Sequence, residues 1–224
     1  TALIVTTFGG LAMLAGLIML AHAAGSWRIS GVLAAAPRLL ADDGGRVLLE
    51  VAVGPVLIGA LTKSAQAPFH FWLPGAMAAP TPVSAYLHAA AMVKAGVFLV
   101  ARLAPAFHEL ATWQVLVLGL GLWTLLLGGW RALRQTDVKL VLAYGTVSQL
   151  GFLMVANGLG VRDAALAGLA MLLAHALFKA PLFMVVGIID HEAGTRDLRE
   201  LSGIGRRHPV LAAVAVMALS LIHI

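Results

Sequence analysis

No cysteine occurs anywhere in this sequence of 224 residues. Disulfide bonds, cysteine-ligated zinc, iron–sulfur clusters and covalently attached haem are therefore excluded from this stretch of chain. We expect no bound cofactor and no metal ion here, and any electron carrier would have to belong to a partner protein.

Charged residues are also scarce. They make up 11% of the sequence, against about 25% in a typical globular protein. Hydrophobic residues make up 61%, and the mean hydropathy is +0.95. A water-facing surface built from this composition would expose apolar patches far larger than soluble monomers tolerate. The composition excludes a soluble enzyme, a collagen and a disordered tail, and it indicates a polytopic membrane protein.

Long apolar stretches fit the same class, because a helix needs about 20 residues to cross the hydrocarbon layer. We expect an all-α protein with a single transmembrane domain over residues 1–224, containing six full spans and a shortened seventh. The stretches run over residues 2–22, 46–66 with a broken continuation to 79, 83–103, 113–130, 138–158, 164–189 and 209–224. The segment 25–45 is predicted to be extramembrane, with either an interfacial helix or an ordinary loop from Trp27 to Leu40.

Both ends of the sequence lie inside apolar stretches, without a signal peptide or a flanking charge. We therefore expect a fragment of a longer protein. The final residues, from Leu219 to Ile224, depart from the small-residue pattern before them, and we expect them not to be native.

Lys and Arg outnumber Asp and Glu by 15 to 10, but most of the excess consists of arginines in short loops. The positive-inside rule accounts for this without a nucleic-acid partner. One side of the membrane receives Arg131, Arg134, Lys139, Arg196, Arg199, Arg206 and Arg207, and the other receives Arg28, Arg38, Arg46, Arg102 and Arg162. The count of seven against five predicts that the loop 190–208 faces the cytoplasm.

Ionisable residues inside the spans are the main functional candidates, because each costs about 2.5 kcal/mol or more at the bilayer centre. They are Lys63, His88, Lys94, Lys139, His175 and Lys179. Buried lysine and histidine can both gain and lose protons near neutrality, so a row of them joined by water can relay protons.

Each candidate also has a structural interpretation. Lys139 follows Asp137 at a membrane edge, where snorkelling to the interface is the favoured interpretation. The two histidines could instead be core residues bonded to backbone carbonyls. His175 and Lys179 lie four residues apart and share a helix face. His88 and Lys94 lie six apart, about 120° around an ideal helix, and therefore cannot point at one spot.

Several helix breakers interrupt the second span. Pro68 removes a backbone donor and clashes with the carbonyl four residues before it, so we expect the helix to break there. Lys63, Ser64 and Gln66 lie at the break. Irregular backbone at membrane depth is tolerated only where protein or a water-filled cavity satisfies it, and in transporters it marks ion sites. We expect Lys63 to face the interior.

Four sequence motifs resemble the antiporter-like subunits of Mrp Na⁺/H⁺ antiporters, respiratory complex I and membrane-bound hydrogenases. They are KSAQAPFHFWLP at 63–74, APTPVSAYLHAAAMV at 79–93, DVKLVLAYGTVSQLG at 137–151 and HALFKAPLF at 175–183. Lys94 and the segment DHEAGTRD at 190–197 most resemble the large A subunit of Mrp antiporters, and the complex I subunit is the alternative.

The resemblance implies a fourteen-helix fold with two inverted five-helix repeats, each with a broken helix. It assigns the proton relay to Lys63, His88, Lys139, His175 and Lys179, with Lys94 as an additional candidate. It also implies that complex I relatives often carry another histidine at the position of Met171, and that the glutamate partner of Lys63 lies upstream of this sequence.

The implied function is that of a transporter subunit in a bacterial plasma membrane, moving H⁺ against Na⁺ with other subunits of a Mrp-type complex. The alternative is a proton-pumping subunit of NADH:quinone oxidoreductase or a membrane-bound hydrogenase. We expect the 224 residues alone to transport nothing.

Three other classes fit less well. A retinal photoreceptor needs an intramembrane carboxylate near its lysine, and the spans offer none near Lys63 or Lys179. A metal protease is excluded because Thr195 stands where a second zinc histidine would follow His191. A structural scaffold would place buried polar groups at random, whereas here they recur about once per span.

Overall fold

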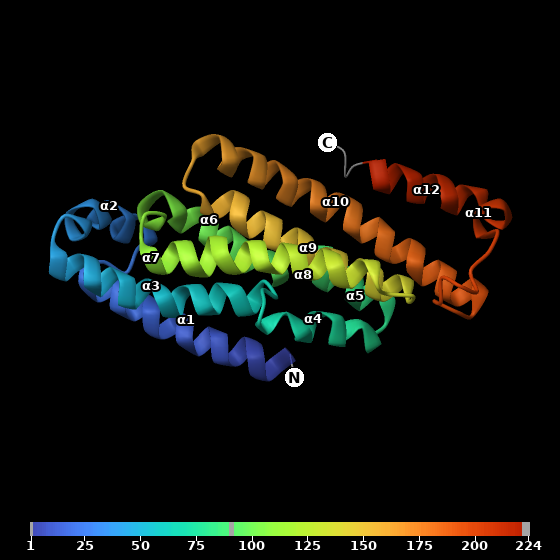
Figure 1. Ribbon diagram of the computed structural model, residues 1–224, viewed down its shortest axis with the longest axis horizontal. Helices are drawn as coiled ribbons and strands as arrows, with labels where there is room; N and C mark the ends of the chain where they lie inside the picture. Colours follow the sequence, from blue (N-terminus) through green and yellow to red (C-terminus); the bar gives the residue numbers. More distant parts are fainter. Residues whose placement is uncertain (1, 90–91, 221–224) are drawn as a thin grey trace.

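The computed structural model describes residues 2–89 and 92–220, and all of the regular elements in those two ranges are helices (Figure 1). This confirms the prediction of an all-α protein. The expectation that the sequence ends in non-native residues concerns, in part, positions 221–224, which lie outside the described ranges.

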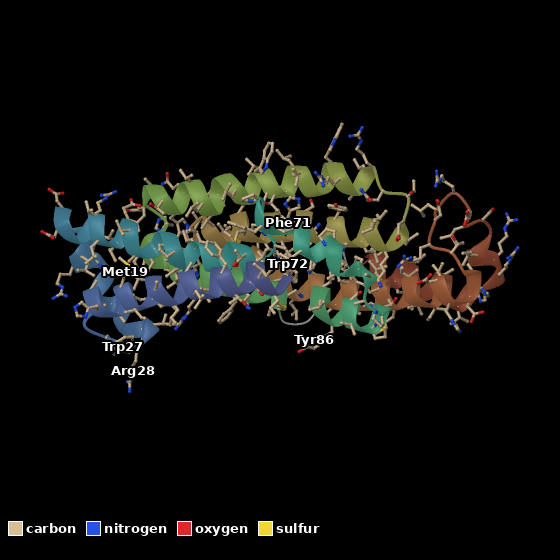
Figure 2. All side chains as sticks on the ribbon, turned by 90° about the horizontal axis from the view of Figure 1, so that it is seen from below. Met19, Trp27, Arg28, Phe71, Trp72 and Tyr86 are labelled. Carbon is tan, nitrogen blue, oxygen red and sulfur yellow. The ribbon has the colours of Figure 1, made fainter. Side chains whose placement is uncertain are left out.

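Helices α1 (Ala2–Ala24) and α3 (Asp43–Lys63) pack against each other over their length, with α2 (Ile29–Leu40) covering one end (Figure 1). Glycine allows the close approach. A Cβ atom on Gly16 would lie 2.6 Å from the carbonyl oxygen of Ala52. Small residues commonly allow such contacts between helices in membranes. The stretch from Trp27 to Leu40, for which the sequence left an interfacial helix and a loop open, thus contains helix α2. Figure 2 shows Trp27 and Arg28 projecting away from the bundle beside it.

After α3 the chain passes through three short helices before the next span begins. These are η1 (Phe69–Phe71), α4 (Trp72–Gly75) and η2 (Ala76–Ala78), and α4 continues roughly in the direction of α3 after an offset (Figure 1). The third span then follows in pieces, as α5 (Thr81–Ala89), η3 (Met92–Lys94) and α6 (Ala95–Phe107). The sequence predicted one continuous helix over 83–103.

The next two spans form an antiparallel hairpin. The first consists of α7 (Ala111–Trp113), the π-helical turn η4 (Gln114–Gly119) and α8 (Leu120–Leu133), and the second is α9 (Val138–Gly158). Gly128 and Gly151 allow the two helices to meet backbone to backbone. Asp137 begins α9 by accepting hydrogen bonds from the amides of Lys139 and Leu140, which satisfies donors that a helix start leaves unpaired.

Helix α10 (Arg162–Ala193) has 32 residues, which at 1.5 Å per residue extends about 48 Å. It is therefore longer than the hydrocarbon layer is thick, about 30 Å. It ends at Ala193, and the next residue, Gly194, has a φ of 67°, the left-handed conformation that glycine adopts readily. The chain then turns through α11 (Ile204–Arg207) and returns along α10 as α12 (Pro209–Ser220) (Figure 1).

Within residues 2–89 and 92–220, six helical segments are long and apolar enough to span a membrane, and the number of full spans expected was also six. The α8–α9 turn and the 194–203 loop lie at one end of the bundle, and α2 with the α9–α10 turn lies at the other (Figure 1). The two groups of basic residues therefore occupy opposite ends, as predicted. That the 190–208 end faces the cytoplasm stays a prediction.

Candidate functional site

Hydrogen bonds to the backbone stabilise the break in the second span. Helix α3 ends at Lys63, five residues before Pro68. A continued helix would need the missing amide of Pro68 to donate to the carbonyl of Ser64. The side chain of Gln66 takes over this task, because its Nε2 donates to that carbonyl at 2.9 Å. The predicted break is therefore confirmed. It begins about one turn before Pro68, because a proline disrupts the helical turn that precedes it in the chain.

Neighbouring elements hold the irregular segment in place. The amide of Ala67 donates to Oγ1 of Thr124 on α8 at 2.8 Å, and the indole of Trp72 donates to the carbonyl of Thr62 at 3.0 Å. These contacts provide the partners that hydrocarbon would not. Thr124 was not singled out from the sequence, although it is the one hydroxyl residue of α8.

Lys63 is only half-buried, so the prediction that it faces the interior holds in part. It is the last residue of α3 and lies beside the opening in the helix. No ion pair joins it to an acidic side chain within residues 2–89 and 92–220. The adjacent Ser64 Oγ and Gln66 Oε1 are buried and have no hydrogen-bond partner among the described residues.

The two intramembrane histidines are completely buried, and neither bonds to a backbone carbonyl. The His88 ring lies 4.7 Å from the Phe183 ring, and the His175 ring meets Phe178 edge-on at 5.2 Å. All four ring nitrogens lack a hydrogen-bond partner in the described part of the chain. Buried polar atoms are rarely left unpaired, and buried water is the usual partner of those that lack one in the protein.

Lys179 lies one turn beyond His175 on α10, and both side chains are buried, in keeping with the shared helix face that their spacing predicts. The Lys179 Nζ donates to the carbonyl of Leu142 on α9 at 3.1 Å. It also lies 5.9 Å from the centre of the Phe178 ring. Gly145 of α9 lies beside this ammonium group, since a Cβ there would be 3.4 Å from Nζ, an ordinary contact.

Lys139 points inward and does not snorkel. Its side chain is 2% exposed, and its Nζ donates to the carbonyl of Ala79 at 2.6 Å. Ala79 directly follows η2, the last of the short helices after the break. The snorkelling interpretation favoured by the sequence is therefore wrong, because the irregular segment offers the ammonium group a carbonyl within the protein.

Lys94 is buried in η3. The argument that His88 and Lys94 diverge by about 120° assumed one regular helix between them. Lys94 itself lies in a 3₁₀ turn, and the stretch that joins it to His88 is not fully described, so the divergence of the two side chains stays a prediction. Positions 90 and 91, which belong to the second motif, lie outside the described ranges.

Contacts with α10 show which of the candidates lie together. His88 on α5 packs against Phe183, one turn beyond Lys179, and Lys179 reaches Leu142 on α9, the helix that carries Lys139. Both α5 and α9 pack against α10, and η3, which carries Lys94, contacts α5. Lys63 lies apart from these four elements, at the end of α3.

Outside the spans, the loop after α10 is joined to the start of α9. The amide of Val138 donates to the carbonyl of Arg196 at 3.0 Å, and the Arg196 side chain lies 3.4 Å from the carboxylate of Asp137. Arg199 lowers the pKa of the Asp197 carboxyl to about 2 through hydrogen bonds, so this carboxylate is charged at neutral pH. The loop therefore supports the helix end that carries Lys139.

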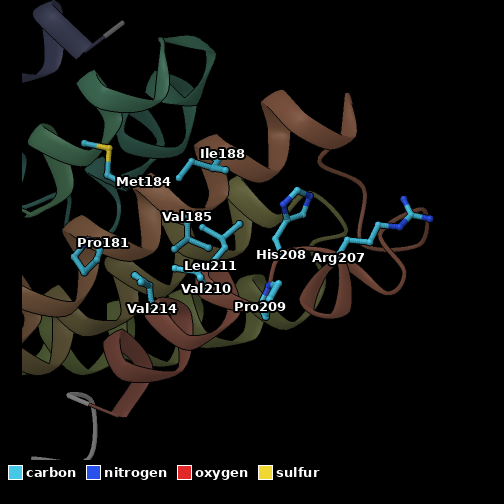
Figure 3. Close-up of a pocket in the computed structure, with 10 residues that line it drawn as sticks. All are labelled: Pro181, Met184, Val185, Ile188, Arg207, His208, Pro209, Val210, Leu211 and Val214. Carbon is cyan, nitrogen blue, oxygen red and sulfur yellow. The ribbon is translucent and has the colours of Figure 1, made fainter.

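Metal-binding groups and cavities are two other features that can mark a ligand site. The described residues contain no group of three or more His, Cys, Asp or Glu side chains that could hold a metal ion. A cavity of about 670 Å³ lies between α10 and α12 (Figure 3). Its lining is apolar except for Arg207 and His208, and it contains none of the six candidate residues.

Comparison with known proteins places this arrangement in a family. The model of the NADH:quinone oxidoreductase/Mrp antiporter transmembrane family matches residues 1–223. The chain belongs to this family. It is 50% identical over 97% of its length to the A/B subunit of a probable K⁺/H⁺ antiporter of Rhizobium meliloti, and covers 21% of that protein. It is 46% identical over 98% of its length to the A subunit of the Na⁺/H⁺ antiporter of Alkalihalophilus pseudofirmus, and covers 28% of it.

Solved structures agree. The chain superposes on the Mrp complex from Dietzia sp. DQ12-45-1b with a TM-score of 0.81 and 38% identity, covering 99% of this chain and 26% of that one. It superposes on a membrane-bound sulfane sulfur reductase, an archaeal respiratory complex, with a TM-score of 0.84 and 25% identity, covering 96% and 44%. The chain thus spans between a fifth and a third of the length of these curated relatives.

Proposed function

We propose that this chain is part of the large A subunit of a Mrp-type cation/H⁺ antiporter and relays protons through its buried lysines and histidines. The observation that carries the proposal is the cluster of five buried basic residues whose four histidine nitrogens have no hydrogen-bond partner in the described residues. The names of the relatives support antiport, with Na⁺ in one and K⁺ in another. We take Na⁺ as the exchanged cation, other subunits of the complex as partners, and the bacterial plasma membrane as the location.

The contacts fit the two protonation states that a relay needs. A protonated Lys139 or Lys179 is held by a carbonyl, from Ala79 or Leu142 respectively. When the lysine gives its proton to water, the water passes a proton to a neutral histidine nitrogen, and the other ring nitrogen releases one onward. Only N–H and O–H bonds form and break. His88 and His175 each have two nitrogens available for this exchange.

A redox-driven proton pump is the second candidate. The superposition on the archaeal respiratory complex has the slightly higher TM-score, whereas the Mrp complex has the higher identity. The relay chemistry would be the same in both. Proton movement that requires Na⁺ and no electron donor supports antiport, and movement that requires a donor supports the pump.

The relay is tested by His175→Ala in the full-length protein within its complex. Everted vesicles would be energised, and Na⁺-dependent proton efflux followed with a pH-sensitive dye. We expect a large loss of flux with unchanged assembly, because the variant removes two proton-accepting nitrogens from the cluster.

His191→Ala is the matched control, since His191 lies on the same helix with an exposed side chain, and we expect normal flux from it. Unchanged flux in the His175 variant would refute the relay.

A further inference from the structure

Two backbone hydrogen bonds join the loop after α10 to the start of α9. The amide of Val138 donates to the carbonyl of Arg196 at 3.0 Å, and the amide of Leu198 donates to the carbonyl of Thr136 at 2.8 Å. They lie on either side of the antiparallel bridge that Asp137 forms with the loop. We call this pair of bonds the clasp.

The side chain of Arg196 lies between the ends of two helices. Its Nε is 3.4 Å from Oδ2 of Asp137, which caps the start of α9, and 4.0 Å from Oδ1 of Asp190. Asp190 belongs to the last turn of α10. One guanidinium group therefore links α9, which carries Lys139, to α10, which carries Lys179.

The carboxylate of Asp137 has a different partner on each oxygen. Oδ1 accepts from the amide of Lys139 at 2.8 Å and from the amide of Leu140 at 3.3 Å, whereas Oδ2 faces Arg196. The first amides of a helix have no partner inside the helix, so the cap decides where the first turn lies. Arg196 thus acts on Lys139 through the orientation of this one carboxylate.

The other end of Lys139 makes the contact that the relay uses. Its Nζ donates to the carbonyl of Ala79 at 2.6 Å, and its side chain is 2% exposed. Proton transfer requires heavy atoms about 2.6–3.2 Å apart. A shift at the start of α9 would move the ammonium group away from Ala79, because the capped amide and the ammonium belong to the same residue.

We propose that Arg196 is a positioning residue for the proton step at Lys139, which it holds in register with Ala79 and with α10 through the clasp and Asp137. The inference rests on the proposed proton relay and adds a residue outside the buried cluster. Arg196 exchanges no proton itself, since a guanidinium group stays protonated in proteins. Its effect is on geometry alone.

Arg196→Gln in the full-length protein within its complex tests the role. The side chains of Arg196 and Asp137 are 37% and 29% exposed. We expect Na⁺-dependent proton flux per assembled complex to fall about threefold, as for the loss of one partly exposed ion pair. Arg196→Lys keeps the charge and should retain most of the flux.

Arg199→Gln is the matched control. It breaks the ion pair with Asp197 in the same loop but leaves the contacts of Arg196 in place, so we expect normal flux from it. Flux at the parent level in Arg196→Gln, or an equal loss in Arg199→Gln, would overturn the proposal.

Asp137→Asn separates the ion pair from the helix cap. Asparagine keeps the oxygen that accepts from the first amides of α9 but loses the charge that faces Arg196. We expect the same fall in flux as in Arg196→Gln, and no further fall in the double variant, because both changes remove one interaction. Losses that add up would show that the two residues act separately and would contradict the proposal.

A disulfide across the clasp separates position from charge. Residues paired beside an antiparallel bridge have Cα atoms about 5.5 Å apart, within the range of a disulfide. Thr136→Cys and Leu198→Cys would be combined with Arg196→Gln, and the complex without these two cysteines would receive the same oxidant. Oxidation should restore flux and reduction should lower it again. A closed disulfide that leaves flux low, or no cross-link when Arg196 is present, would overturn the proposal.

The same flux measurements distinguish this inference from the relay itself. If His175→Ala abolishes flux while Arg196→Gln transports normally, the relay stands and the positioning role fails. If the disulfide restores flux to Arg196→Gln while His175→Ala transports normally, Arg196 positions Lys139 but the relay through His175 fails.

Discussion

Single polar atoms decide how this chain tolerates irregular backbone and charge at membrane depth. Oγ1 of Thr124 accepts from the amide of Ala67 and donates to the carbonyl of Leu120 at 2.6 Å. One hydroxyl therefore ties the segment after the broken helix to α8. The carbonyl of Ala79 likewise accepts a hydrogen bond from Lys139, and the carbonyl of Leu142 accepts one from Lys179.

Thr124→Val tests this role at constant shape. It leaves the buried amide of Ala67 without an acceptor, which we expect to cost about 1–3 kcal/mol of stability. The thermal transition of the purified complex should fall, and proton flux should fall with it because Lys139 relies on the same segment.

Thr124→Ser keeps the hydroxyl and should restore both properties. A valine variant as stable and as active as the parent would show that the Ala67 amide finds another partner.

The role of a residue could be predicted from the sequence where the deciding feature lies nearby in the chain. It could not be predicted where a residue distant in the chain makes the deciding contact. The sequence identifies Lys139 as a lysine at a span edge, but it cannot show that a carbonyl from residue 79 lies 2.6 Å from its Nζ. Ser64 and Gln66 could be found because they adjoin Pro68. Asn157 was missed, although it is buried and its Oδ1 has no partner among the described residues, and a polar residue in an apolar span is a signal of the same kind as a lysine.

At the scale of elements, α8 and α9 depend on glycine for their close packing. A Cβ on Gly128 would lie 2.5 Å from the amide nitrogen of Ser148, which belongs to the backbone and cannot rotate away. The neighbouring Gly129 would place its Cβ 3.5 Å from the Ser148 hydroxyl, an ordinary contact.

Gly128→Ala should therefore force the two helices apart and destabilise the protein by about 1–3 kcal/mol, whereas Gly129→Ala should have little effect. The two variants would be compared by thermal unfolding in the same detergent. Equal transition temperatures would contradict the backbone contact.

The sequence predicted elements well where their ends carry local signals. Helix α9 runs from Val138 to Gly158 as expected, because Asp137 caps its start. Helix α10 extends to Ala193, beyond the predicted residue 189, since a helix leaving the membrane can continue through polar residues until Gly194. The 3₁₀ turn Met92–Lys94 in the third span had no signal, as neither proline nor glycine lies between His88 and Lys94.

At the scale of the whole molecule, the chain encloses its buried bases and exposes large apolar side chains. Leu3, Leu126 and Leu177 are each more than half exposed, as lipid-facing residues are. His175 and Lys179 share α10 with Leu177 but lie on its buried face. This arrangement concentrates basic side chains in the interior, where backbone carbonyls hold the ammonium groups of Lys139 and Lys179.

A structure of the full-length complex in lipid nanodiscs, at a resolution that shows ordered water, tests this account most directly. We predict water within hydrogen-bonding distance of the ring nitrogens of His88 and His175, continuing toward Lys139 and Lys179. Ring nitrogens bonded to protein groups, or a dry space between the histidines and the lysines, would contradict the proposed relay.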